Sequence, residues 1–137
     1  MKTRFFSIIL AAVLLGTGCR TTTEPARVSL PAGDPARGKA AFTSMNCFAC
    51  HTVVGHNFPA PYAQPAVPVA LGAEATRPTR TQLVDSIVNP SHAIEAGYKE
   101  ELVRSGRLSR MGDYSEVMTV RQLSDLVAFL ESLPRTK

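Results

Sequence analysis

Apolar and small side chains recur at helical spacing in three parts of this chain of 137 residues. The first part opens with Asp34, a residue type that caps helices, and Pro35 follows where a missing N–H costs nothing. The positions behind them are three or four residues apart, which predicts one buried helical stripe. These positions are Gly38, Ala41, Phe42 and Met45. We therefore predict a helix over residues 35–45.

Two further helices are predicted from Thr-x-x-Gln capping boxes, in which both side chains bind backbone N–H groups of the first turn. The box at Thr79 opens a helix over residues 80–88, which Asn89-Pro90 ends. The box at Thr119 opens a helix over residues 120–133, before a proline. Their apolar positions are Leu83, Val84, Ile87 and Val88 in the first helix and Leu123, Leu126, Val127, Leu130 and Leu133 in the second.

The segments between these helices lack a helical period. Four prolines fall within residues 56–71, which predicts an extended loop that wraps a flat apolar face. Its apolar residues are expected to be buried: Phe58, Val67, Val69 and Leu71. Residues 91–96 are expected to form a short turn. Residues 98–111 are expected to be extended or looped, with a turn at Ser105-Gly106.

The N-terminus has the pattern of an export signal. Lys2 and Arg4 precede an apolar run over residues 5–15, which is too short for an ordinary membrane span, and small residues follow. We predict a signal peptide over residues 1–18, a lipid-anchor cysteine (Cys19) with a flexible tether over residues 19–33, and a folded domain over residues 34–137. In the alternative, cleavage without lipidation leaves a soluble exported protein with an unpaired thiol at Cys19.

The run Cys47-Phe48-Ala49-Cys50-His51 carries the clearest chemistry of the chain. Two thiols three positions apart can each form a thioether with one haem vinyl group, and the adjacent histidine can then bind the iron as proximal ligand. A thioredoxin-like dithiol expects a βαβ context, and a structural zinc site expects a second ligand pair that is missing downstream. We therefore predict one covalent haem c, and export agrees with it because such haem is attached outside the bacterial cytoplasm.

Charge and composition narrow the function. The formal net charge is +4, and loss of Lys2 and Arg4 with the leader would leave +2. So small an excess does not favour nucleic-acid binding, although a local basic patch could attract an acidic redox partner. The sequence has no evident acid/base pair and no nucleophile beside an activating base, so we expect no enzyme activity and no small-molecule substrate.

Four residues beyond the motif could supply a second, distal iron ligand. His56 lies only five positions after His51, too close for the chain to reach the opposite face of the haem. Met118 stands directly before the Thr119 cap, where a hydrophobic staple to the helix is expected. Met111 lies sixty positions after His51 in an irregular segment, so it is the predicted distal ligand, and Met118 and His92 are the alternatives.

Residues 34–133 resemble a monohaem class I cytochrome c domain. The resemblance rests on the Cys47-Cys50-His51 motif, on Gly38 and Phe42 in the first helix, on Leu126 and Phe129 in the last, and on the segment Met111-Gly112-Asp113-Tyr114. It implies an all-α fold of three to four helices with long loops around one haem. It also implies that a proline carbonyl, from Pro59 or Pro61, orients His51. Gly112 departs from the proline that is common at this position, which loosens the loop.

These features predict an exported carrier of single electrons between a donor and an acceptor redox protein. A His/Met pair would close the iron and raise its reduction potential relative to two histidines. We expect the protein on the periplasmic side of a bacterial membrane, held by lipid at Cys19, or else soluble in the periplasm. Two other functions stay open: a haem enzyme or gas sensor with a labile distal ligand, and a haem subunit of a larger oxidoreductase.

Overall fold

The structure is a computed structural model that describes residues 29–63, 69–73, 77–92, 94 and 99–134. Its elements are the helices α1 (Pro35–Ser44), α2 (Arg80–Val88), α3 (Glu100–Val103) and α4 (Val120–Glu131), the 3₁₀ helix η2 (Cys47–Ala49), and the strands β1 (His51–Val53), β2 (Val69–Leu71), β3 (Arg104–Ser105) and β4 (Leu108–Ser109). The described part is mostly helical, which confirms the predicted small all-α fold. The predicted signal peptide, Cys19 and most of the tether lie outside the described residues.

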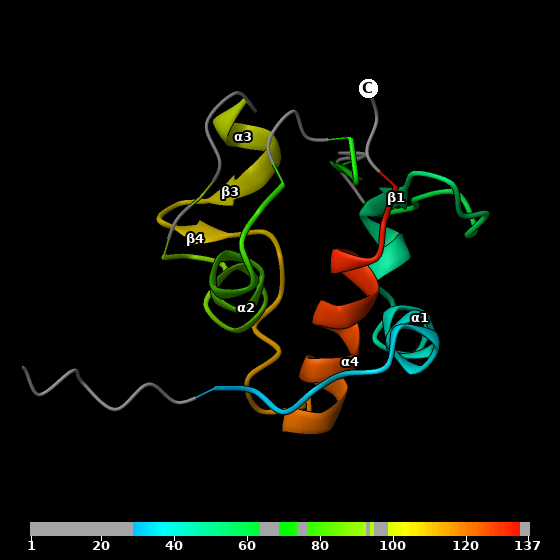
Figure 1. Cartoon of the computed structure of the whole chain (residues 1–137). Helices are drawn as coiled ribbons and strands as arrows, with labels where there is room; N and C mark the ends of the chain where they lie inside the picture. Colours follow the sequence, from blue (N-terminus) through cyan, green and yellow to red (C-terminus); the bar gives the residue numbers. More distant parts are fainter. Residues whose placement is uncertain (1–28, 64–68, 74–76, 93, 95–98, 135–137) are drawn as a thin grey trace, which may run out of the picture.

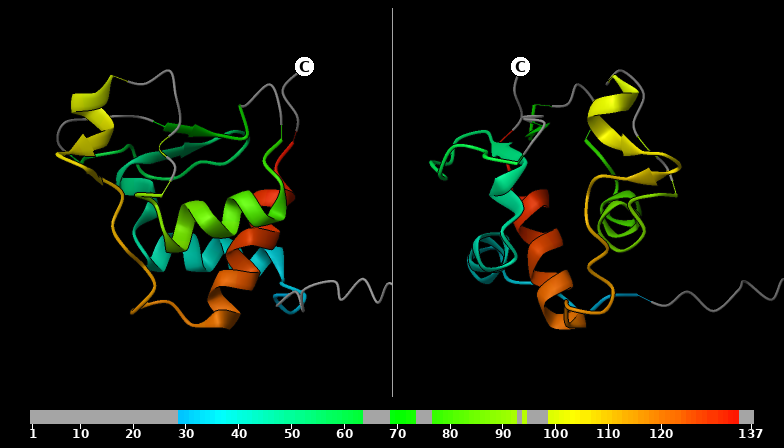
Figure 2. Two further views of the ribbon diagram at one scale, coloured as in Figure 1. Left: turned by 90° about the vertical axis from the view of Figure 1, so that its left-hand side faces the viewer. Right: turned by 180° about the vertical axis from the view of Figure 1, so that it is seen from behind.

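Helix α4 forms the centre of the molecule. Figure 1 shows α1 and α2 nearly end-on, on opposite sides of α4, and α4 packs against both. The two views of Figure 2 show the same order, with α2 and the β3–β4 hairpin on one side of α4 and α1 with β1 on the other. The core consists of buried side chains from α1, β1, α2, α4 and the residues just after α4: Phe42, Val53, Ile87, Leu123, Leu126, Val127, Phe129 and Leu133.

The helix starts follow the sequence. Asp34 caps α1, since its side chain accepts a hydrogen bond from the Arg37 N–H, and Pro35 is the first helical residue. Both capping boxes are formed. The side chains of Thr79 and Thr119 each accept a hydrogen bond from the backbone N–H of the glutamine three positions later, and that glutamine's side chain accepts one from the threonine's backbone N–H. The three predicted helices are therefore confirmed, with ends at Ser44, Val88 and Glu131.

Helices α1 and α4 meet at the two helix backbones. A Cβ atom on Gly38 would lie 2.0 Å from the carbonyl oxygen of Asp125 and 2.6 Å from the Cβ atom of Phe129. No larger residue fits there without separating the helices. This close contact lets the rings of Phe42 and Phe129 pack edge to face, with centroids 5.9 Å apart.

Asp125 joins the same two helices by charge. Its side chain is buried and accepts hydrogen bonds from the Asp34 N–H (2.7 Å) and from Nε and Nη2 of Arg37 (2.8 and 3.1 Å). The side-chain hydrogen bond from Arg37 lowers the pKa of Asp125 below its ordinary value. The carboxylate is thus charged at neutral pH, and its acceptor atoms are satisfied by the first turn of α1.

Two expectations about the loops are wrong in part. Residues 69–71, placed in the proline-rich loop, form strand β2, which pairs in parallel with β1 so that His51 lies opposite Val69. Within residues 98–111, predicted to be extended or looped, Glu100–Val103 form the short helix α3. The turn at Ser105-Gly106 is confirmed, since β3 and β4 form an antiparallel hairpin and Gly106 has φ 63°.

The burial expected for the proline-rich loop is tested at two positions. Phe58 and Leu71 are half-buried against the core, as predicted, whereas Val67 and the side chain of Val69 lie outside the description. The turn expected over residues 91–96 is described only at residues 91, 92 and 94. Within the described ranges, the structure holds no helix with the length and apolar character of a membrane span.

Candidate haem site

Cys47 begins η2 and Cys50 is the residue that caps its C-terminus, a few residues after α1. Asn46, with φ 60°, turns the chain from α1 into η2 in a left-handed conformation that asparagine tolerates. Within η2 the Cys50 N–H donates to the Cys47 carbonyl over 3.2 Å. Both cysteines are half-buried and neither forms a disulfide. The pair is therefore available for thioether bonds.

The Cys47 thiol lies in an apolar environment. Burial raises the pKa of Cys47 to about 11, and the neighbouring Cys50 adds a smaller effect in the same direction. The thiol is therefore protonated at neutral pH. Phe48, between the cysteines, packs with other apolar side chains against the core.

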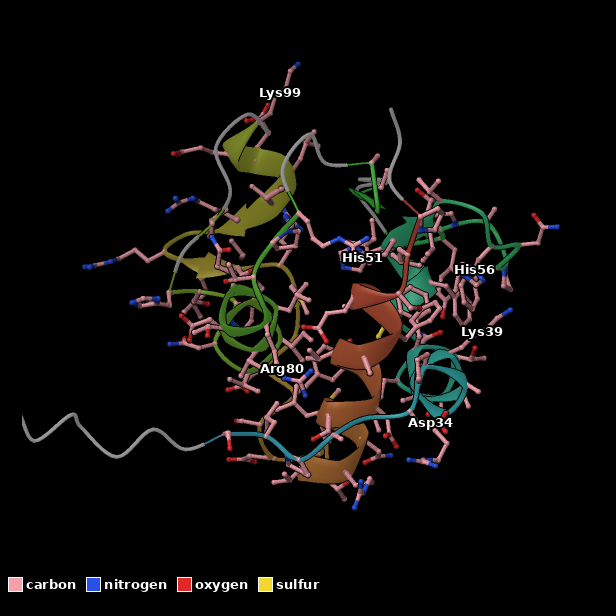
Figure 3. The ribbon with its side chains drawn as sticks, viewed as in Figure 1. Asp34, Lys39, His51, His56, Arg80 and Lys99 are labelled. Atoms are coloured by element: carbon pink, nitrogen blue, oxygen red, sulfur yellow. The ribbon has the colours of Figure 1, made fainter. Side chains whose placement is uncertain are left out.

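His51 begins strand β1, directly after η2. Its Nδ1 atom is buried, and its backbone is held in the parallel pairing with β2. Figure 3 shows His51 near the centre of the molecule, on the side of β1 that is nearer α2. The imidazole therefore points toward the side of α4 on which α2 lies. The segment after β4 runs along the same side (Figure 1).

A loop folds back over η2 and fixes it. The N–H groups of Tyr62 and Ala63 both donate to the Ala49 carbonyl, over 3.0 and 2.9 Å. The Asn46 amide donates to the Tyr62 hydroxyl, and the Tyr62 ring meets Phe48 edge to face. The loop carries Pro59 and Pro61. That the carbonyl of one of these two prolines orients His51 stays a prediction.

Tyr114 brings the segment after β4 to the cysteines. Its hydroxyl donates a long hydrogen bond of 3.4 Å to the carbonyl of Met45, two residues before Cys47. Burial raises the pKa of Tyr114, and the proximity of Cys47 and Cys50 raises it further. Tyr114 is not among the site residues predicted from the sequence. Its place three positions after Met111 is the one feature of the sequence that points to a role for it near the haem site.

Met111 and Met118 are both half-buried and both pack against the core. The Met118 N–H donates to the Tyr114 carbonyl over 3.0 Å, and Met118 packs against the apolar cluster to which Leu123 belongs. The staple between these two residues stays a prediction. The Met111 N–H instead donates to the hydroxyl of Ser109 over 3.1 Å. Met111 therefore lies between the β3–β4 hairpin and the segment that Tyr114 holds beside the cysteines.

The two other histidines have different surroundings from His51. The His56 ring packs against Phe129 and Phe58, with centroids 5.1 and 6.0 Å away, and Figure 3 shows it on the outer side with Lys39. His92 is exposed, with its Nδ1 atom 3.7 Å from an Asp85 carboxylate oxygen. Cys19 lies outside the described residues.

The chemistry of the donor set fits haem c. Two unoxidised thiols and one inward imidazole fall within five consecutive residues. These three side chains are the groups that two thioether bonds and one axial iron bond require. Among the residues that the structure describes, no three His, Cys, Asp or Glu side chains gather as a metal-ion site. The local arrangement is thus that of a haem-attachment motif at the edge of an apolar core.

Comparison with known proteins supports the same identity. The family described as cytochrome c matches residues 35–134. No curated protein matches the chain. The matched range begins at the first residue of α1, includes the motif, and ends just beyond α4. The chain therefore belongs to the cytochrome c family of haem-binding electron-transfer proteins.

Proposed function

We propose that this protein is an exported monohaem cytochrome c that carries single electrons between two redox proteins, and that His51 and Met111 are the two axial ligands of its iron. The observation that carries the proposal is the contact of Tyr114 with Met45. It joins the Met111 segment to the end of α1, two residues before Cys47, although sixty positions separate Met111 from His51. A methionine from this segment is therefore well placed to serve the same cofactor as the motif.

Each residue has one role in this proposal. Cys47 and Cys50 hold the macrocycle by thioether bonds, and His51 supplies the proximal imidazole. Met111 supplies a thioether, a soft ligand that favours ferrous iron and raises the reduction potential. The haem, when bound, supplies the one-electron couple. Leu83 and Met118 are among the half-buried apolar side chains that pack against the core.

The placement in the cell rests on the N-terminal pattern. A signal over residues 1–18 and a lipid on Cys19 would hold the domain on the periplasmic side of a bacterial membrane, where a donor and an acceptor protein can reach it. Without the lipid the protein would be soluble in the periplasm. Membrane fractionation of wild-type and Cys19→Ser cells is the measurement that tests this placement.

The ligand assignment is tested by near-infrared absorption of the oxidised holoprotein. We expect the weak band from sulfur bound to ferric iron in the wild type and in Met118→Ala. We expect it to be lost in Met111→Ala, which removes the thioether. Met118→Ala is the matched control because it removes a half-buried methionine from the same core.

Two results would reject the assignment. A wild-type spectrum without the band would mean that no methionine binds the iron. A band that persists in Met111→Ala but disappears in Met118→Ala would transfer the role to the residue that we place in the staple.

Gly112 favours a second function, a haem enzyme or gas sensor with a labile distal ligand. It is exposed, and a Cβ atom built on it would have only Tyr114 Cε2 as a neighbour, at 4.0 Å. No packing therefore restrains the chain directly after Met111. Rapid binding of carbon monoxide to the reduced protein would support this function in place of the carrier.

A further inference from the structure

Two serines connect Met111 to the rest of the fold through its backbone. The Met111 N–H donates to the Ser109 hydroxyl oxygen over 3.1 Å. The Ser109 N–H in turn donates to the hydroxyl oxygen of Ser91 over 3.0 Å. Ser91 follows α2, and Ser109 is the last residue of β4. The backbone at Met111 is thereby tied to the end of α2 through two side chains.

The residue before Met111 is held as well. The Arg110 N–H donates to the Val103 carbonyl over 2.9 Å. The Arg110 guanidinium Nε donates to the carbonyls of Glu101 (3.2 Å), in α3, and Arg104 (3.0 Å), the first residue of β3. Four hydrogen bonds donated by Arg110 and Met111 to carbonyls or the Ser109 side chain of the hairpin region therefore fix the approach to Met111 from its N-terminal side.

The other side of Met111 is much less restrained. Gly112 is exposed, and within the described part of the chain the nearest atom to a Cβ built on it, its chain neighbours aside, is Tyr114 Cε2 at 4.0 Å. Asp113 is also exposed, and its side chain accepts only the local N–H of Ser115. Tyr114 is the next residue with a contact to a distant element. Movement of Met111 is therefore resisted mainly by the hydrogen bonds that precede it.

We propose that Ser109, supported by Ser91, is a positioning residue that sets how firmly the Met111 thioether stays on the iron. This inference rests on the proposed function, because it assumes that Met111 is the distal ligand. Displacement of the thioether by movement of this segment would break the hydrogen bond from the Met111 N–H to Ser109. The serine pair thus takes over the restraint that a proline at position 112 would supply.

The test is displacement of the thioether by added imidazole in the oxidised holoprotein, followed at the near-infrared band. Ser109→Ala removes the acceptor of the Met111 N–H, so the imidazole concentration that displaces half of the band should fall roughly threefold to tenfold, as expected for one partly exposed hydrogen bond. Ser91→Ala should change it in the same direction. Ser109→Thr keeps a hydroxyl and should restore the wild-type concentration.

The matched control is Ser132→Ala. It also removes one serine hydrogen bond to a backbone atom, the 2.7 Å bond to the Phe129 carbonyl, at the end of α4 and outside the Met111 segment. It should leave the half-displacing concentration unchanged. Far-ultraviolet circular dichroism of each variant checks the helices, and Ser91→Ala provides a second variant if Ser109→Ala does not fold.

The outcomes separate this inference from the proposed function. If the wild type has the band and Met111→Ala lacks it, but both Ser109→Ala and Ser91→Ala titrate like Ser132→Ala, the positioning role is wrong and the ligand assignment holds. If Ser109→Thr fails to restore the titration, the hydroxyl is not the cause and the positioning role is also wrong. A band that survives Met111→Ala overturns both.

Discussion

Two glycines of this chain stand in opposite surroundings. Gly38 lies where α1 touches the backbone of α4, and a Cβ atom there would come within 2.0 Å of the Asp125 carbonyl oxygen. Gly112 lies beside Met111 with its nearest neighbour at 4.0 Å and without a left-handed φ. A methyl group therefore has no room at the first position and ample room at the second.

From this contrast we predict opposite effects of the same substitution. Gly38→Ala should lower the free energy of unfolding by at least about 1–3 kcal/mol, because the added methyl group separates α1 from α4. Gly112→Ala should raise it by about 0.4–1 kcal/mol, because alanine reduces the freedom of the unfolded chain. Denaturant unfolding of the holoprotein measures both. Equal effects at the two positions would contradict the close packing of α1 on α4.

Prediction from single residues succeeds where the chemistry is local. The motif places two thiols and an imidazole within five residues, so its chemistry needs no knowledge of the fold. Tyr114 shows the limit. Its contact with Met45 joins residues 69 positions apart, and no spacing rule in the sequence links them. Residue types alone therefore predict the attachment site but not the side chains that the fold brings to it.

Among the secondary-structure elements, those with their own start and stop signals were predictable. Helices α1, α2 and α4 each have a side-chain cap and several turns, so their bounds follow from the sequence. Helix α3 has four residues and no side-chain cap, and the paired strands have only two or three residues each. Such short elements depend on tertiary contacts, which a periodicity argument does not contain.

The junction of α1 and α4 predicts a dependence of stability on pH. The folded-state pKa of Asp125 lies below its ordinary value of about 3.9, because Arg37 and the Asp34 N–H bind the carboxylate. Its contribution to stability is therefore fully present above about pH 4 and is lost as the pH falls through the lower folded pKa. Asp125→Asn should be less stable than the wild type at neutral pH.

The measurement is the difference in free energy of unfolding between wild type and Asp125→Asn as a function of pH. We expect the difference to stay constant from pH 7 to about pH 5 and to shrink below about pH 4, where the wild-type carboxylate takes up a proton. Asp113→Asn serves for comparison: hydrogen bonding to Ser115 also lowers the pKa of Asp113, so its pH dependence should have the same sign without involving the junction of α1 and α4. A difference that grows toward acid pH would contradict the assigned direction of the pKa shift.

For the whole molecule, the question is whether side chains of the protein occupy both axial positions of the haem iron. The sequence predicts the cofactor and the fold, and membership in the cytochrome c family confirms them. The distal side that we propose would be formed by the β3–β4 hairpin and the segment that Tyr114 ties to Met45, so it would depend on contacts between distant parts of the chain. Carrier and sensor differ only in whether this segment keeps a ligand on the iron.

Mixing the reduced holoprotein with carbon monoxide tests this closure most directly. We predict that the visible spectrum of the wild type does not change in the seconds after mixing, because the Met111 thioether occupies the sixth position. Met111→Ala, with that position open, should bind carbon monoxide within the same time. Rapid formation of the carbon monoxide complex by the wild type would contradict the closed electron carrier.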